Sequence, residues 1–518
     1  LKTLYDEKLL RLKSPLSLVS TSSATKREKR SLSLSKQSLS KRSLSKRGEG
    51  EIFWQWDIAK IEALNITDNV VDLMIGQLQK LPEATQQILR LAACIGNCFD
   101  LNTLSLIAKQ SIAEISQHLL PALTDGLVQN TGSRTGKSSA IQNQADSQFL
   151  HDRVQQAAYV LISDEQKSTI HLKIGRLLWK NTSDESLSEH LFEIVDHLNL
   201  GLALVTSETE KEEIARLNLK AGQKAKAATA YEAAMKYLET GLKGLSSNSW
   251  ETQYNLTLAL HLEVIEAEYL NAHHQQVSLI SQIVLQHAKT MLDQVKVYEI
   301  QIQSHIAQNQ MMTAVDTGLY VLEKLGISLV ESPPQILAIE TLYSLPDMLF
   351  PDKLAAMRLL MCIFAPSYVA HPTLVPQITF TMVNLCINEG NSRLSGFAYM
   401  LYSFLLYSLG DIELGYQFGK LAQALVEQFA ATEIKCKVDC LFNASLHWKE
   451  PAHHAIKSFP QTIQIGLEVG DLEYAAFSAM TECENRYLVG EPLQITLSKQ
   501  KAYIHFIQKI QQEFQLYT

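Results

Sequence analysis

The feature that most constrains this chain is a helical hydrophobic period that runs from about residue 153 to the end. Apolar residues recur three and four positions apart, the pattern of amphipathic helices, and short turns between them imply antiparallel neighbours. The segments predicted to be helical are 153–180, 187–204, 211–243, 251–270, 276–292, 295–308, 311–325, 335–350, 353–389, 392–408, 411–430, 433–447, 455–469, 472–488 and 497–517.

Several of these helix pairs have the packing positions of a tetratricopeptide repeat. The small and aromatic residues at those positions are Leu217, Ala221, Ala233 and Tyr237, and again Tyr399, Ser403, Leu406, Gly415, Gly419 and Ala422. Gly410-Asp411 and Gly470-Asp471, the latter followed by Ala475, mark turns between helices. Because stacked helix pairs form superhelices, residues 166–518 are predicted to be a tetratricopeptide-like superhelix, with a break near 331–352. Such a stack is usually a scaffold or a ligand-sensing groove.

The region 51–165 has a different pattern. Thr67-Asp68 is a candidate N-cap for a helix that starts near Val70 and ends before Pro82, and the next helix stops at Gly96-Asn97. Helices at 101–109 and 112–124 precede two short strands, Leu127-Val128 and Gln148 to Leu150, which flank a polar loop. Helices followed by a two-stranded wing predict a winged-helix module. The fold class is therefore mainly α: a winged helix followed by helical repeats.

Residues 13–50 are a low-complexity stretch in which Ser-Leu-Ser-Lys recurs every five residues. Residues 26–47 hold nine basic residues against one acid, a net charge of +8. Because the whole chain has a net charge of –8, the rest of the chain carries –16. We expect a disordered linker or insertion, since it lacks apolar surface to bury. The alternative is that these basic residues form an arm that contacts an anionic membrane or nucleic acid. The acidic body gives no reason to expect nucleic-acid binding.

The sequence favours a location in the cytoplasm. No segment of about 18 uninterrupted apolar residues predicts a membrane span, and there is no signal-peptide pattern. Cys94/Cys98 and Cys436/Cys440 are spaced to share a helix face, and the seven cysteines are expected to be buried thiols in a reducing cytoplasm. Both ends fall within apparent helices, which favours an internal piece of a longer protein.

No complete catalytic motif is present in the sequence. Gly132-Ser133-Arg134-Thr135-Gly136-Lys137-Ser138 resembles a Walker A loop but has three residues between its glycines instead of four, and it lies in a polar loop. Protein-kinase signatures and spaced metal-ligand motifs are missing. We therefore predict no catalytic and no metal-binding residues in this chain.

One candidate site remains, at the end of the second wing strand. His151 stands at the start of a helix, where it can donate to an anionic ligand held by a neighbouring domain, and Asp152 can cap that helix. The alternative is an interface histidine with a capping aspartate.

Several short sequence segments resemble those of one family, the cyanobacterial-type multi-sensor signal-transduction kinases. They are Trp54-Gln55-Trp56-Asp57, Ile66 to Val71, Leu91 to Gly96, Phe149 to Tyr159 and Ala221 to Lys226. The resemblance implies a serine/threonine kinase domain and an AAA-type signalling ATPase, then helical repeats, GAF sensors and usually a histidine kinase. Residues 1–12 would end the ATPase helical subdomain, and 51–165 would be its winged helix.

In related ATPases a Met-His-Asp motif holds ADP through its histidine, and Leu150-His151-Asp152 is similar. The resemblance thus implies a nucleotide-sensing role for His151 and Asp152, with ATP or ADP bound mostly by upstream segments. The expected partners are the adjacent ATPase core, kinase and sensor domains of the parent, and a protein or small-molecule ligand on the repeats.

The leading hypothesis is a non-catalytic regulatory segment of a two-component-type signalling kinase in the cytoplasm. One alternative is that the function belongs to the whole parent, as a serine/threonine or histidine kinase. The second is an ATP-dependent winged-helix transcription regulator, which is weakened by a helix at 112–124 without lysine or arginine.

Overall fold

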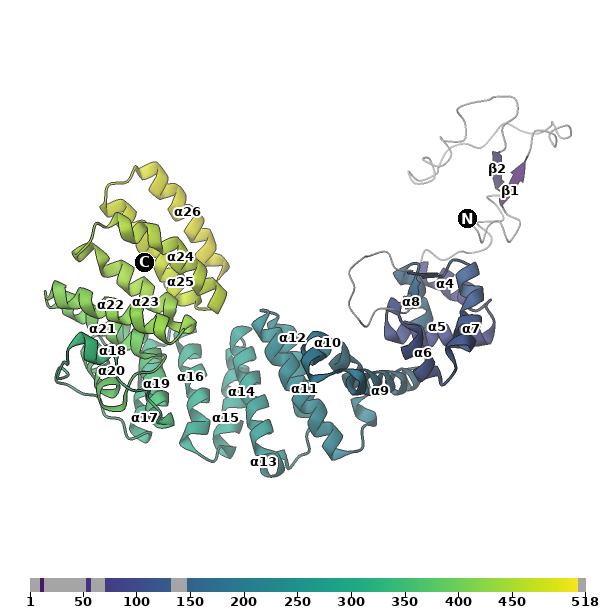
Figure 1. Ribbon diagram of the computed structural model, residues 1–518, viewed down its shortest axis with the longest axis horizontal. Helices are drawn as coiled ribbons and strands as arrows, with labels where there is room; N and C mark the ends of the chain where they lie inside the picture. Colours follow the sequence, from purple (N-terminus) through teal and green to yellow (C-terminus); the bar gives the residue numbers. More distant parts are fainter. Residues whose placement is uncertain (1–9, 14–52, 57–69, 132–146, 511–518) are drawn as a thin grey trace. The chain divides into compact units, whose positions relative to one another are not determined.

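The computed structural model describes residues 10–13, 53–56, 70–131 and 147–510. It divides into two compact units, with the division between Leu204 and Val205 (Figure 1). The predicted linker beyond residue 13, the N-cap at Thr67-Asp68, the Walker-like loop and the helix end after residue 510 lie outside the described residues.

The first unit begins with two short strands. β1 (Leu10–Lys13) pairs antiparallel with β2 (Phe53–Trp56), with Leu10 opposite Trp56. The resemblance implied that residues 1–12 end a helical subdomain. Residues 10–13 instead form a strand that pairs with β2.

The next four helices confirm the sequence prediction. They are α4 (Val70–Leu78), α5 (Glu83–Ile95), α6 (Leu101–Ala108) and α7 (Ile112–Thr124). Side chains fix the starts of the last two helices. Asp100 accepts a hydrogen bond from the Thr103 amide at 2.8 Å, and Ser111 and Glu114 form a capping box, so otherwise unpaired amides of the first turn are satisfied.

A three-stranded sheet accompanies these helices. β4 (Val128–Asn130) and β5 (Ser147–Phe149) are the two predicted wing strands, and β5 also pairs with β3 (Cys98–Phe99), giving the order β3-β5-β4. The sequence analysis missed β3. It also placed Cys98 on a helix face with Cys94, which is wrong because α5 ends at Ile95; Cys98 is exposed.

The first unit continues with three helices, α8 (Asp152–Val160), α9 (Asp164–Asn181) and α10 (Asp184–Leu200), and the short 3-10 turn η2 (Leu202–Leu204). The single helix predicted over 153–180 is therefore two helices. Ser163 is extended, with φ –67° and ψ 150°, and interrupts the helical backbone. α9 packs against α5 and α6, so it is part of the core of this unit.

The second unit is a stack of helices. In chain order they are α11 (Glu208–Ala227), α12 (Tyr231–Gly244), α13 (Ser249–Thr252), α14 (Tyr254–Leu270), α15 (His274–His287), α16 (Met291–Ala307), α17 (Met311–Lys324), α18 (Ile339–Tyr343), α19 (Pro351–Ala370), α20 (Leu374–Glu389), α21 (Ser395–Ser408), α22 (Ile412–Gln428), α23 (Thr432–Ser445), the 3-10 turn η3 (Leu446–Trp448), α24 (His453–Val469), α25 (Leu472–Leu488) and α26 (Leu493–Lys509).

Consecutive helices of this unit pack side by side, and first helices of successive pairs also touch, as α21, α23 and α25 do (Figure 1). The chain has the predicted tetratricopeptide-like fold. Three helix predictions are wrong in detail. Residues 211–243 and 353–389 each form two helices, because the chain turns at 228–230 and at 371–373, and residues 335–350 are largely irregular around α18.

The predicted glycine-aspartate turns are confirmed. Gly410 and Gly470 have φ of 87° and 79°, a left-handed conformation that favours glycine. Asp411 and Asp471 then cap the following helices by accepting from the amides of Leu414 and Tyr474. Gly419 allows the predicted close approach, since a Cβ there would lie 2.7 Å from the Phe442 ring.

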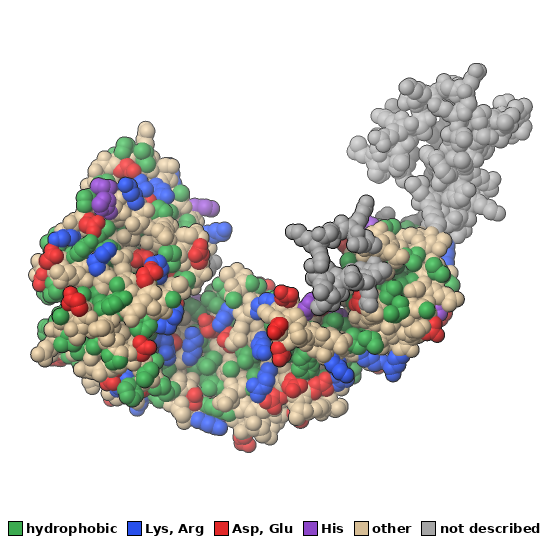
Figure 2. Space-filling model, viewed as in Figure 1, with side chains coloured by type: hydrophobic (Ala, Val, Ile, Leu, Met, Phe, Trp, Pro, Cys, Tyr) green, Lys and Arg blue, Asp and Glu red, His purple; other side chains and the backbone are tan. Residues whose placement is uncertain are grey.

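Several charged residues of the second unit form ion pairs with one another. Acidic and basic side chains are interspersed on the face shown in Figure 2. For example, the Lys226 ammonium lies 2.5 Å from Glu263 and 3.1 Å from Glu266, which joins α11 to α14.

Helix α19 departs from one expectation. It is long and apolar enough, by length and composition, to cross a membrane, although the sequence analysis expected no such segment. Half of its most apolar window is buried inside the unit. Ala355, Leu359 and Ile363 belong to the main hydrophobic core, where α19 packs against α16, α17 and α20.

Candidate functional site

The histidine singled out by sequence lies at an exposed corner of the first unit. His151 is the N-cap residue of α8 and is separated from the end of β5 by Leu150, and both His151 and Asp152 are exposed. No side chain caps this helix, because Asp152 is its first helical residue; the expected capping role of Asp152 is wrong. A carboxylate in the first turn still interacts favourably with the helix dipole.

The surroundings of His151 leave its imidazole available. Among the described residues its ring has no hydrogen-bond partner, and Leu150 beside it is 53% exposed. An exposed, unbonded histidine next to an exposed apolar side chain can contact another domain or a ligand. The geometry does not itself show a nucleotide site.

The other end of α8 is connected to the unit's interior by a chain of polar contacts. The Tyr159 hydroxyl lies 3.0 Å from Nε2 of His171 on α9, and Nδ1 of His171 lies 2.8 Å from Nδ1 of His197 on α10. Both histidines are buried, and burial lowers the pKa of each, that of His197 to about 4. At neutral pH they are uncharged and join three helices.

The second unit contains a concave site that the sequence did not predict. Residues 325–350 interrupt the helical stack between α17 and α19, with only α18 as regular structure. Connections this long without secondary structure are uncommon in compact domains and are often functional. We call this segment the insertion.

The insertion is held firmly at both ends. The Val330 amide donates to the Thr381 hydroxyl at 2.8 Å. At the other end, the Asn391 side chain donates to the Leu342 carbonyl at 2.7 Å, and the Asn391 backbone exchanges hydrogen bonds with Pro346 and Met348. The backbone there is tightly packed, so the position of the insertion is fixed.

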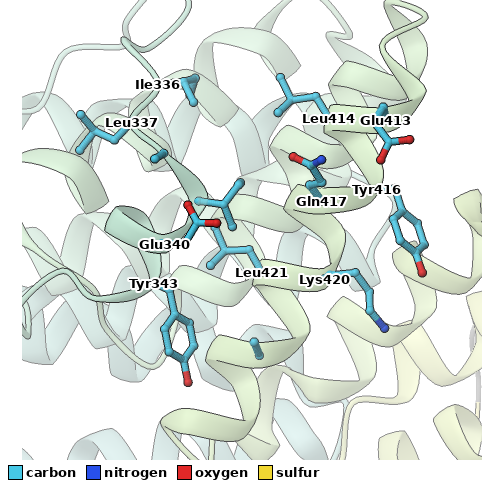
Figure 3. A pocket seen from close by; sticks show the side chains of 13 residues that line it. Ile336, Leu337, Glu340, Tyr343, Glu413, Leu414, Tyr416, Gln417, Lys420 and Leu421 are labelled. Carbon is cyan, nitrogen blue, oxygen red and sulfur yellow. The ribbon is translucent and has the colours of Figure 1, made fainter.

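Between these attachments the insertion lies beside α22, and the two line a cavity of about 790 Å³ that is open to solvent (Figure 3). This volume is typical of small-ligand pockets, which span about 300–1,000 Å³. The lining residues are Ile336, Leu337, Ala338, Ile339, Glu340, Tyr343, Glu413, Leu414, Tyr416, Gln417, Lys420, Leu421 and Ala424.

Most of the lining is aliphatic, and its polar groups differ in how they are paired. Lys449 and Gln417 donate to Glu413 and hold its pKa below the usual range. Tyr416 donates to Glu450 at 2.5 Å, and His454 lies 3.0 Å from the same carboxylate. These groups are satisfied within the protein and shape the rim of the cavity.

A metal site is not suggested by the part of the chain that the structure describes, which has no cluster of three or more histidine, cysteine or acidic side chains. The cavity could not be predicted from the sequence because its two walls are about 80 residues apart. The usable signal was Pro346, which lies inside the helix predicted over 335–350 and argues against it, together with Pro333-Pro334 just before that segment.

Comparisons with known proteins find one signalling protein among the curated relatives. No family model matches the chain. A curated relative, hybrid signal transduction histidine kinase G of Dictyostelium discoideum, is 26% identical over 550 aligned positions. The alignment covers 88% of this chain but 16% of the relative, so the chain spans about a sixth of that protein's length.

Two solved structures resemble the chain more distantly. One is a signal transduction ATPase with numerous domains and a tetratricopeptide repeat sensor from Pyrococcus horikoshii, with TM-score 0.40, 10% identity, and coverage of 85% of this chain and 59% of that one. The other is the Rap conjugation gene regulator of plasmid pLS20 in complex with the Phr* peptide, with TM-score 0.41, 14% identity, and coverage of 67% and 92%. The similarity to a signalling protein is the one with the histidine kinase, and that relative is not cyanobacterial.

Proposed function

We propose that this chain is a non-catalytic regulatory segment of a longer signal-transduction kinase, and that its repeats bind a ligand that controls the kinase. The observation that carries the proposal is the cavity: a stack of otherwise regular helices is interrupted by an ordered insertion, which forms one wall of a ligand-sized space. The similarity to part of a hybrid histidine kinase supports the signalling context.

Filling the cavity tests this role. Ala424→Trp in the full-length kinase should fix its phosphorylation output in cells at one level across growth conditions, because a bulky side chain occludes the space. Ala502→Trp is the matched control, since Ala502 is an exposed alanine on α26 outside the cavity. Output that still follows growth conditions in Ala424→Trp would argue against ligand sensing here.

We further propose that ligand binding is coupled to a nucleotide switch through the winged helix. On this view His151 reaches the phosphates of ADP held by an ATPase core elsewhere in the parent, as its resemblance to a Met-His-Asp motif implies. Its exposure, and the absence of a hydrogen-bond partner for its ring within the described part of the chain, support that role. Asp152, exposed beside it, would contribute negative charge to the start of α8 and would not contact ADP phosphate directly.

Retained nucleotide is the direct measurement of this coupling. His151→Ala in the full-length protein should reduce the ADP that co-purifies, detected by chromatography after denaturation, and should raise basal phosphorylation. His190→Ala is the control, because His190 is an exposed histidine on α10 away from the start of α8. Equal ADP content in wild type and His151→Ala would contradict the switch.

The kinase activity itself we assign to other parts of the parent, as serine/threonine or histidine phosphorylation. The transcription-regulator alternative gains no support from the structure. α7, the helix that would enter DNA in a winged helix, has no lysine or arginine.

A further inference from the structure

From the charges around the cavity we infer that its ligand is a short apolar peptide with free amino and carboxyl ends. This inference rests on the proposed function, because it identifies the ligand of the same cavity. It is argued from the lining of the cavity, from the charged groups that the protein leaves unpaired, and from where those groups lie.

The floor of the cavity selects an apolar body. Leu414 and Leu421 of α22 and Leu337 of the insertion line the space (Figure 3). Ala424 of α22 and Ile339 of the insertion also line it. Leu337 is 37% exposed, so the protein alone does not cover this surface. Burial of such aliphatic surface by a ligand is favourable at roughly 25 cal/mol per Å².

Two opposite charges at the rim lack ion-pair partners. Among the described residues, no carboxylate lies within salt-bridge distance of the Lys420 ammonium, and no cation lies within that distance of Glu340. Lys420 instead lies 5.5 Å from the centre of the Phe442 ring. The pKa of the nearby Glu450 is lowered by hydrogen bonds from Tyr416 and His454 and also by the charge of Lys420, but the direct contacts of this carboxylate are with Tyr416 and His454.

These two groups come from opposite walls. Glu340 is on α18 in the insertion, and Lys420 is on α22, with Leu421 next to it. The other lining carboxylate, Glu413, is neutralised by Lys449. A ligand that satisfies both free charges has one cationic and one anionic end separated by an apolar body. A short apolar peptide, with its ammonium at Glu340 and its carboxylate at Lys420, has that arrangement.

Four forms of trileucine provide the probes: with both ends free, N-acetylated, C-amidated, and blocked at both ends. Binding to the 518-residue chain is measured by isothermal titration calorimetry up to millimolar peptide. We expect the free peptide to bind tightest, and each blocked end to weaken binding about three-fold, as for exposed ion pairs. Ala424→Trp should abolish binding of all four forms, whereas Ala502→Trp should not.

Charge variants then locate each end. Lys420→Gln should remove the advantage of a free carboxyl end and leave the preference for a free amine, and Glu340→Gln should do the reverse. The double variant Glu340→Lys with Lys420→Glu exchanges the two charges, and it should again bind the free peptide, with the two peptide ends exchanged. If either substitution acted only by disturbing the structure, the double variant would not recover binding.

The outcomes separate the two proposals. Equal binding of all four peptides, or no binding at millimolar concentration, overturns the peptide assignment. The regulatory role of the cavity is then still tested by the cellular experiment with Ala424→Trp. The expected charge dependence together with normal cellular regulation of the Ala424→Trp kinase would support the peptide site and overturn the proposed function.

Discussion

The attachment of the insertion to Asn391 gives the most direct test of how the cavity is built. Asn391 is 1% exposed, and its side-chain amide donates to the carbonyl of Leu342, a fully buried residue. Its side-chain oxygen also accepts a long hydrogen bond, 3.4 Å, from the Tyr399 hydroxyl. Replacement of Asn391 by alanine removes both contacts and leaves two buried polar groups unpaired.

The expected cost follows from that geometry. A buried group left without its partner costs about 1–3 kcal/mol, and most of the loss here is at Leu342, because the contact with Tyr399 is long. About 2 kcal/mol corresponds to roughly a 30-fold increase in local opening of the insertion. The backbone hydrogen bonds from Asn391 to Pro346 and Met348 remain, so the second unit should stay folded.

Hydrogen exchange followed by mass spectrometry measures this opening. Peptides that contain the Met348 amide, which donates to the Asn391 carbonyl, should exchange faster in Asn391→Ala, and peptides from α14 to α16 should not change. Asn384→Ala is the matched control, because Asn384 donates only within its own helix, to the Phe380 carbonyl at 2.9 Å. The reasoning fails if Asn391→Ala leaves the insertion as protected as in wild type, or if Asn384→Ala exposes it equally.

Two further predictions concern the interior of each unit. Because burial lowers the folded-state pKa of His197 from 6.5 to about 4, its stabilising contribution is complete above about pH 6.5 and is lost as the pH falls toward 4, by up to about 3 kcal/mol. Thermal unfolding from pH 7 to 4.5 should therefore be less pH-dependent in His197→Gln than in wild type or in the exposed control His190→Gln, and identical slopes would contradict it. In the second unit, Gly318→Ala should destabilise the core by about 1–3 kcal/mol in urea unfolding, since its Cβ would lie 2.2 Å from the Ile363 side chain. Gly76→Ala, where no atom lies within 4 Å, should not destabilise, and a neutral Gly318→Ala would show that the helices can separate at little cost.

The helices and their turns could be predicted from sequence because their signals are local. Gly410-Asp411 and Gly470-Asp471 encode a left-handed residue and an N-cap within two positions, and the structure uses both pairs in that way. The side of each helix that packs was predicted less accurately. Ala233 and Tyr237 were expected at the packing positions, but the fully buried residues are their neighbours Ala234 and Leu238.

The features that the sequence did not predict depend on contacts between distant parts of the chain. β3 has only two residues, and it exists because β5, about 50 positions later, supplies its partners. The insertion has helical hydrophobic spacing at Ile336, Ile339 and Leu342, yet its path is set by hydrogen bonds to Thr381 and Asn391. The cavity follows from those contacts, and no local pattern contains them.

The contacts among Tyr159, His171 and His197 have a consequence for proton positions. Two Nδ1 atoms that face each other at 2.8 Å require one ring to donate and the other to accept. If His171 donates to His197, its Nε2 must accept from Tyr159; if His197 donates, the His171 ring takes the other tautomer and donates to Tyr159. The chain thus has two ordered hydrogen-bond directions, and a change of tautomer on α10 reverses the polarity of the bond at Tyr159, eight residues along α8 from His151.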